Sequence, residues 1–271
     1  MTNERSLGAG TPRGAAPVSP ISLDIEGGVA VVTLCRPPVN AIDDGWLHRL
    51  DEVLDLAEAD PRVRVLWIRS AQRVFCAGAD LSFMRERFAT EAGRAAMIAF
   101  TRRLQEAYAR IERSPKVSLA EIGGAALGGG FELALACDLR VVSGQARLGL
   151  PEARLGLLPA AGGTQRMTRI CGEAVARRLI LGAEVIAGTE AVALGLAQWQ
   201  APPEELHALA GSIAARIAGL PGAALRECKR CIGAALDPEQ DGYEVELEGS
   251  GALLALAETQ ALVRQFLDKS A

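Results

Sequence analysis

The sequence predicts an α/β fold, in which strands and helices alternate through the core and an α-helical region follows at the C-terminal end. Apolar runs of strand length recur up to residue 142, segments with a helical apolar period separate them, and the pattern after about residue 161 is mostly helical. The 271 residues are enough for a large, well-buried core. We expect a flexible lead over residues 1–19, an α/β core over 20–200 and a helical region over 201–271.

The first regular elements of the chain are predicted to be a β-hairpin and a helix. Residues 21–25 and 29–34 are apolar strands on either side of a turn that contains two glycines. Asp43 or Asp44 can then cap a helix. The apolar positions of that helix keep a 3.6-residue period: Trp46, Leu47, Leu50, Val53, Leu54 and Ala57.

The following elements are predicted to alternate between buried strands and helices. Residues 63–68, 117–122 and 139–142 are mostly apolar runs, which is typical of strands covered on both faces. A long helix is expected over 91–113 and a short one over 130–136. The long helix has apolar residues at Ala95, Ile98, Leu104, Ala107 and Ile111.

The composition argues against several classes of partner. Lys plus Arg number 29 and Asp plus Glu number 33, so the net charge is −4, whereas nucleic acids and anionic membranes need a concentrated basic surface. No apolar run approaches the ~18 residues that would span a bilayer, and the start of the chain lacks the apolar segment of a secretory signal. We therefore expect a cytoplasmic protein with no nucleic-acid partner and no membrane partner.

The residues that most often bind metals or act as nucleophiles are sparse. The six cysteines are expected to be mostly buried free thiols, and the CxxC pair of Cys228 and Cys231 has no second pair beside it. The two histidines, His48 and His207, lie among charged residues of expected helices, which leaves little for a Ser-His-Asp triad or a histidine metal site. Neither a Walker loop nor an early G-x-G-x-x-G turn is present. We expect no metal and no separate cofactor.

Two glycine-rich turns point to a ligand site. Residues 75–81 follow a strand, and their small side chains let the backbone approach a ligand closely. Residues 123–133 lead from a buried strand into a short helix, whose first N–H groups and dipole suit an anion or a developing oxyanion. The second turn also has a purely structural interpretation, in which its glycines only permit a tight strand-to-helix connection.

Two glutamates are candidates for acid–base chemistry. Glu132 precedes the apolar run 133–137, so its carboxylate is expected to be buried, with a raised pKa that suits a general acid or base near neutral pH. The alternative is a buried ion pair with Arg140 or Arg154. Glu152 follows in another mostly apolar stretch. Two carboxylates in such settings can divide acid and base roles between them.

Four segments together resemble the enoyl-CoA hydratase (crotonase) family. They read RPPVNA over residues 36–41, FCAGADL over 75–81, GAALGGGFEL over 124–133, and Pro151-Glu152 followed by LPAAGGTQR over 158–166. The order and spacing are those of the family, and the resemblance runs from about Ile21 to Lys269.

The resemblance implies a spiral of ββα turns with a C-terminal helical region that trimerises, giving a homotrimer or a dimer of trimers. It also implies an acyl-CoA thioester substrate, with coenzyme A as part of the substrate and not as a cofactor. The enolate formed at the thioester carbonyl would be stabilised by an oxyanion hole. By their places in the motifs, the backbone N–H groups of Ala79 and Gly129 would be its two donors.

The resemblance further implies roles for individual side chains. Glu132 would activate a water for attack on Cβ and Glu152 would deliver a proton to Cα, so hydration of a trans-2-enoyl-CoA is the expected activity. The other implied substrate-binding residues are Ala41, Ala77, Asp80, Leu81, Gly128 and Ala160. Candidate cations for the coenzyme A phosphates are Arg36, Lys116 and Lys269.

The sequence departs from the family pattern in places and leaves alternatives open. Ala160 stands where hydratases usually have glycine, Ser82 where a lysine is common, and the usual aromatic near Leu254 is missing. The closest alternative is a Δ3,Δ2-enoyl-CoA isomerase, which needs one base near Glu152 and no attacking water. Thioester hydrolysis, carbon–carbon bond chemistry and a non-catalytic subunit are weaker options. RNA binding, which some relatives perform through a lysine-rich helix, is disfavoured because residues 43–60 are acidic.

Overall fold

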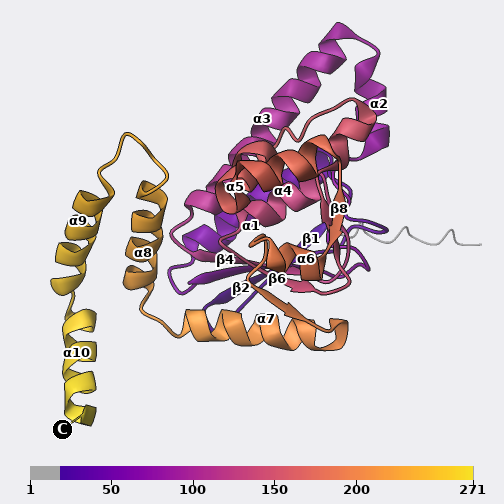
Figure 1. Ribbon diagram of the computed structural model, residues 1–271. Helices are drawn as coiled ribbons and strands as arrows, with labels where there is room; N and C mark the ends of the chain where they lie inside the picture. Colours follow the sequence, from indigo (N-terminus) through magenta and orange to yellow (C-terminus); the bar gives the residue numbers. More distant parts are fainter. Residues whose placement is uncertain (1–18, 271) are drawn as a thin grey trace, which may run out of the picture.

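The computed structural model describes residues 19–270, and a six-stranded sheet lies at its centre (Figure 1). The lead expected over residues 1–19 therefore lies almost entirely outside the described residues. The first two strands form the predicted antiparallel hairpin, and every later neighbour in the sheet is parallel. In spatial order the strands are β1 (Ile21–Glu26), β2 (Val29–Leu34), β3 (Val65–Ser70), β4 (Val117–Ile122), β6 (Leu139–Ser143) and β9 (Trp199–Ala201).

Helices cover both faces of this sheet (Figure 1). Because side chains alternate along a strand, Leu66 and Ile68 of β3 join one core while Val65 and Trp67 join the other. The first face is covered by α1 (Asp44–Ala59), α3 (Glu91–Arg113) and α4 (Gly129–Ala136), and the second by α7 (Pro203–Ala218).

A second, three-stranded sheet brings distant segments together. Its strands are β5 (Ala126–Leu127), β7 (Arg147–Gly149) and β8 (Val185–Ala187), in that spatial order. Leu127 pairs with Gly149 in parallel, and the Gly128 nitrogen donates to the Gly149 carbonyl at 3.0 Å. The second glycine turn and the segment that carries Glu152 therefore leave the same edge of this sheet side by side.

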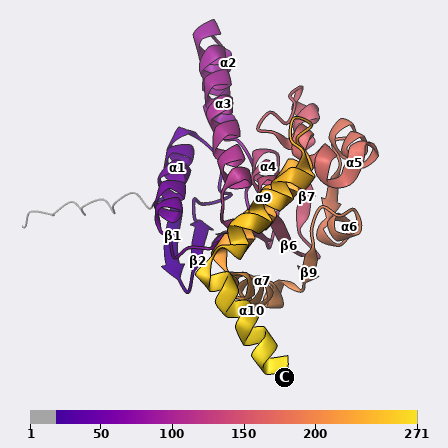
Figure 2. The ribbon, with the colours of Figure 1, turned by 90° about the vertical axis from the view of Figure 1, so that its left-hand side faces the viewer.

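The sequence predictions for α1 are confirmed, and those for α3 are confirmed in part. The Asp43 carboxylate caps α1 by accepting from the Trp46 nitrogen at 2.8 Å, and all six predicted apolar positions of α1 are buried. Helix α3 has the predicted bounds, but Ala95 and Ile98, two of the apolar positions named for it, are exposed. The first half of α3 projects from the sheet beside α2 (Leu81–Phe88), a helix that the sequence analysis did not predict (Figures 1 and 2).

The cysteines are free thiols, as expected, but most of them are not buried. Cys76 and Cys137 are buried, Cys228 is exposed and the other three are half-buried, so that part of the prediction is wrong. The remaining elements of the core are the short 3-10 helix η1 (Pro151–Leu155), α5 (Gly163–Leu181) and α6 (Gly188–Ala193).

The last three helices lie to one side of the core (Figure 1). They are α8 (Gly222–Ala234), α9 (Gly242–Leu254) and α10 (Ala257–Ser270). Large apolar side chains on α9 and α10 are exposed, among them Leu247, Leu254, Leu262, Val263 and Leu267. No single helix among the described residues is long and apolar enough to cross a membrane, and only α7 and α8, which meet at a bend of 103°, pass that test as a pair.

Candidate active site

The two glycine turns meet through backbone pairing. Cys76 in the first turn forms a parallel bridge with Ala126 in the second. A Cβ atom at Gly78 would lie 2.9 Å from the Leu127 carbonyl oxygen and 3.2 Å from the Gly129 nitrogen, and the φ of Gly78 is +92°. Only glycine combines that backbone conformation with so close an approach.

The N–H groups of Ala79 and Gly129 lie close together and are free of the nearby pairing. A Cβ atom at Gly129 would lie 3.9 Å from the Ala79 nitrogen. The bridge between Ile42 and Ala79 is made by the Gly78 carbonyl and the Asp80 N–H, which leaves the N–H of Ala79 itself outside it. Gly129 is the first residue of α4, where a helix N–H has no partner within the helix.

A cavity of about 240 Å³ opens beside these N–H groups. Eight of the ten predicted site residues line it, whereas Ala41 and Asp80 do not. Asp80 instead caps α2, and the Ala41 carbonyl accepts from Arg36. The predicted residues in the lining are Ala77, Ala79, Leu81, Gly128, Gly129, Glu132, Glu152 and Ala160.

The carboxylate of Glu132 is buried in the wall of this cavity and held by two backbone N–H groups. Glu132 is only 3% exposed. Its Oε1 accepts from the backbone nitrogen of Ala161 at 2.8 Å and from that of Gly163 at 2.7 Å. Burial raises the pKa of Glu132 to about 7, and the nearby Glu152 also raises it, while the two N–H groups and Arg166 act in the opposite direction.

The alternative in which Glu132 forms a buried ion pair with Arg140 or Arg154 is wrong. The Arg140 guanidinium donates to the carbonyls of Leu196, Ala134 and Cys137, and that of Arg154 donates to the carbonyl of Ala183. The negative charge on Glu132 is therefore balanced by backbone dipoles and not by a paired cation.

Glu152 enters the cavity from η1, on the side of Gly128. Its Oε1 would lie 3.1 Å from a Cβ atom at Gly128, where φ is +52°. Its Oε2 is buried and has no hydrogen-bond partner among the described residues. Burial raises the pKa of Glu152, which favours the protonated carboxyl. A buried oxygen without a partner, in the wall of a cavity, is suited to exchange a proton with a ligand.

The apolar wall of the cavity was missed by the sequence analysis. Met84 of α2 and Met97, Phe100 and Leu104 of α3 form it, together with leucines around η1. Of these, only Leu104 is among the apolar positions named for the predicted long helix. The signal in the sequence was the helical spacing of Met97 and Phe100 with Leu104 on α3, but α2 has no buried residue that would mark it as a wall.

Other candidate groups lie away from this cavity. Lys116 is buried, and its Nζ donates to the carbonyls of Asp60 and Val63, so Lys116 is not a cation for the coenzyme A phosphates. The exposed His207 stacks on Trp67, on the other face of the sheet. Within residues 19–270, no group of three or more His, Cys, Asp or Glu residues could hold a metal ion.

Known proteins resemble this chain in both sequence and structure. The model of the family described as enoyl-CoA hydratase/isomerase matches residues 24–270. A short-chain-enoyl-CoA hydratase from Clostridium acetobutylicum is 33% identical over 252 residues, which are 92% of this chain and 95% of the relative. A crotonyl-CoA hydratase from Syntrophomonas wolfei has the same identity and coverage.

Solved structures agree with these sequence relatives. An enoyl-CoA hydratase from Bacillus anthracis superposes with a TM-score of 0.84 at 30% identity, over 92% of this chain and 96% of that one. DspI from Pseudomonas aeruginosa superposes with a TM-score of 0.86 at 32% identity, over 96% and 98% of the two chains. The predicted α/β fold class, with its crotonase-like core and C-terminal helices, is thereby confirmed.

Proposed function

The chain belongs to the enoyl-CoA hydratase/isomerase family, and we propose that it is a hydratase that converts a trans-2-enoyl-CoA into a 3-hydroxyacyl-CoA. The observation that carries this proposal is that Glu132 and Glu152 line one cavity together with Ala79 and Gly129. An isomerase needs only one base, whereas hydration needs one group to activate water and another to protonate carbon.

The backbone turns would stabilise the charge that develops during the reaction. When the thioester carbonyl oxygen accepts from the N–H groups of Ala79 and Gly129, negative charge that moves onto that oxygen meets two fixed dipoles and the N-terminus of α4. Because backbone bridges between neighbouring segments hold the two turns that carry these donors, the donors need no reorganisation as the enolate forms. The double bond is thereby polarised for attack at Cβ.

The two carboxyl groups would then divide the proton transfers. Glu132 accepts a proton from water as the water oxygen bonds to Cβ, and Glu152 gives its proton to Cα as the enolate returns to a thioester. The pKa of Glu132, about 7, leaves much of this residue ionised near neutral pH, as a base requires. The raised pKa of Glu152 favours the protonated form that an acid requires.

The proposal includes the nature of the ligand and the assembly. The apolar wall of Met84, Met97 and Phe100 suits an aliphatic acyl chain, and coenzyme A enters as part of the substrate, with no separate cofactor. We also propose that the exposed apolar side chains of α9 and α10 contact further copies of the chain in a homotrimer or a dimer of trimers. A cytoplasmic location stays a prediction from the sequence.

The test follows the loss of enoyl-thioester absorbance of crotonyl-CoA with wild type, Glu132→Gln and Glu152→Gln. We expect turnover by wild type and losses of more than ~100-fold in each variant, as for general acid–base groups. Arg177→Gln, on the exposed side of α5, is the matched control and should keep wild-type activity.

A second substrate separates the two activities of the family. If Glu132→Gln retains wild-type conversion of a 3-enoyl-CoA into its 2-enoyl isomer while wild type never hydrates crotonyl-CoA, the protein is an isomerase with Glu152 as its base. A folded wild type that converts neither substrate would contradict both assignments for short acyl chains.

A further inference from the structure

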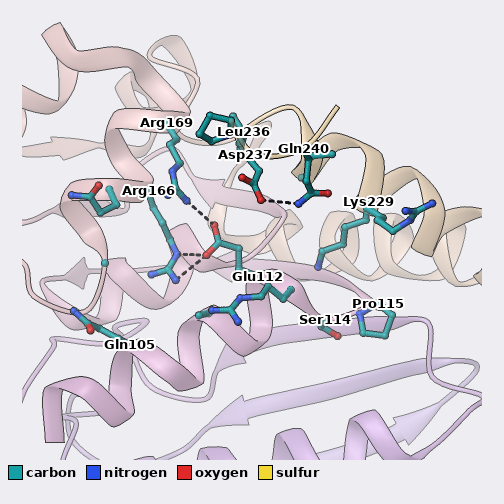
Figure 3. Close-up of a pocket in the computed structure, with 18 of the residues that line it drawn as sticks. Gln105, Glu112, Ser114, Pro115, Arg166, Arg169, Lys229, Leu236, Asp237 and Gln240 are labelled. Atoms are coloured by element: carbon teal, nitrogen blue, oxygen red, sulfur yellow. Dashed lines mark hydrogen bonds and ion pairs between the residues drawn. The ribbon is translucent and has the colours of Figure 1, made fainter. Parts of the chain in front are cut away.

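A second, larger cavity lies behind the segment that holds Glu132. This cavity has a volume of about 940 Å³ and is lined by α3, α5 and α8 (Figure 3). Residues 160–163 separate the two cavities, because Ala160 lines the smaller one while Ala161 and Gly162 line the larger one. The backbone N–H groups of this segment face Glu132 on one side, and its carbonyl groups face side chains of the larger cavity on the other.

Two side chains of the larger cavity bind the carbonyl side of this segment. Arg166 donates from Nη1 to the Ala161 carbonyl at 2.9 Å, and Gln105 donates from Nε2 to the Ala160 carbonyl at 2.6 Å. The other edge of the Arg166 guanidinium donates from Nε and Nη2 to one oxygen of Glu112, at 3.0 and 2.9 Å (Figure 3). Arg166 is 6% exposed, so its planar donors are held between two fixed acceptors.

We propose that Arg166 is a positioning residue that keeps segment 160–163 in register with the carboxylate of Glu132. By fixing the Ala161 carbonyl, Arg166 directs two backbone N–H groups onto Oε1 and leaves Oε2 for the water. This assignment rests on the proposed function in so far as Glu132 is the base of the reaction. The contacts between Arg166 and the segment do not depend on it.

The positive charge of Arg166 also acts on Glu132 directly. The charged and titratable groups that face Glu132 are Glu152 from η1, Tyr108 from α3 and Arg166 from α5. Of these, Arg166 is the only one that lowers the pKa of Glu132, and the two N–H groups that it positions lower that pKa as well. Loss of Arg166 therefore removes one favourable interaction with the ionised carboxylate and, in this proposal, weakens the two from the N–H groups of Ala161 and Gly163.

The experiment compares Arg166→Gln with Arg169→Gln, a matched control on the same helix. Arg169 also pairs with Glu112, at 3.7 Å, but is half-exposed and makes no contact with segment 160–163 among its described interactions (Figure 3). We expect Arg166→Gln to lose about tenfold in kcat and to move the acidic limb of kcat/KM upward by about 1 pH unit. Arg169→Gln should keep the wild-type limb.

Arg166→Lys serves as the conservative variant in case Arg166→Gln folds poorly. Lysine keeps the charge but cannot hold two acceptors with one planar group, so we expect kcat to fall and the acidic limb to move upward by less than in Arg166→Gln. A purely structural role would lower the folded fraction without any movement of the limb. Equal shifts in Arg166→Gln and Arg169→Gln, or none in either, would overturn the proposal.

A readout that needs no turnover separates this proposal from the proposed function. pH-difference infrared spectra identify the protonated carboxyl band of Glu132 by its absence in Glu132→Gln. If the midpoint of that band rises in Arg166→Gln but not in Arg169→Gln, the positioning role stands even when no substrate is hydrated. An unchanged midpoint in a hydratase that works normally would reject the positioning role alone.

Discussion

The backbone nitrogen of Gly163 lies 2.7 Å from Oε1 of Glu132, and a Cβ atom at residue 163 would lie 2.8 Å from the same oxygen. Gly163 therefore donates to the carboxylate of Glu132 and at the same time lies too close to it for any side chain at residue 163. Leu150 closes the other side, with its Cδ1 only 2.9 Å from that Cβ position. The space beside the Cα atom of Gly163 is thus filled by the side chains of Glu132 and Leu150, which leaves the carboxylate no room for a side chain at residue 163.

A Gly163→Ala substitution tests this confinement. The added methyl has no free space, so the Glu132 carboxylate must move, and we expect kcat to fall by about tenfold or more. Overpacking of this kind costs about 1–3 kcal/mol in the free energy of unfolding. Gly233→Ala is the control, because a Cβ atom there meets nothing within 4 Å. Initial rates and urea unfolding measure both effects, and normal activity in Gly163→Ala would contradict the confinement.

The raised pKa of Glu132 predicts a cost to stability at high pH. The pKa is about 7 in the folded protein against 4.5 in the unfolded chain, so the folded state binds the proton more tightly. The stabilisation that Glu132 gives the folded state by binding this proton is fully present below about pH 4.5 and is lost as the pH rises to about 7. Glu132→Gln removes this dependence. The free energy of unfolding of the variant relative to that of wild type should therefore rise by on the order of 3 kcal/mol from pH 5 to pH 8. Urea unfolding at both pH values measures the difference, and a constant difference would contradict it.

The sequence predicts the burial of Glu132 but not its partners. Burial follows from the uniformly apolar run of α4 after Glu132, which is a local property. The donors Ala161 and Gly163 lie 29 and 31 residues further along the chain. Their placement depends on how α5 packs against α4, which no local pattern records. For that reason the choice between a cation and a pair of N–H groups could not be made from the sequence.

The helical period of α3 predicts its length but not where the core ends. Ile98 keeps the apolar spacing, yet it is 65% exposed because the tip formed by α2 and α3 extends past the sheet (Figure 1). Met97 and Phe100, on the neighbouring face, instead line the cavity beside Met84. The apolar wall of the site arises from two helices that meet outside the main core, so its composition was not visible in either segment alone.

Tyr108 links α3 to the oxyanion donor, and its removal provides a third prediction. Its hydroxyl donates to the Gly129 carbonyl at 2.8 Å, and the ring is fully buried. Tyr108→Phe keeps the ring but leaves that carbonyl without this donor, which costs about 1–3 kcal/mol. We expect the N-terminus of α4 to shift and kcat to fall several-fold. Tyr243→Phe, at an exposed site, is the control for stability and rate. Wild-type kcat in a folded Tyr108→Phe would contradict this link.

The methyl group of Ala160 predicts which enoyl groups the site rejects. Ala160 lines the cavity with Glu132 and Glu152, and its carbonyl is fixed by Gln105. The methyl is therefore held beside the place where water meets Cβ in the proposed reaction. A substrate with a second substituent on Cβ competes with that methyl for space, whereas crotonyl-CoA does not.

Ala160→Gly is expected to raise kcat/KM for a Cβ-branched enoyl-CoA relative to crotonyl-CoA by about tenfold, since one methylene-sized group in a pocket discriminates by about that factor or more. Paired initial rates with 3-methylcrotonyl-CoA and crotonyl-CoA measure the ratio. Ala153→Gly provides the control, because Ala153 is exposed on η1 and does not line the cavity. If Ala160→Gly and Ala153→Gly leave the ratio equally unchanged, the methyl of Ala160 does not set the preference, and the apolar wall from α2 and α3 becomes the determinant.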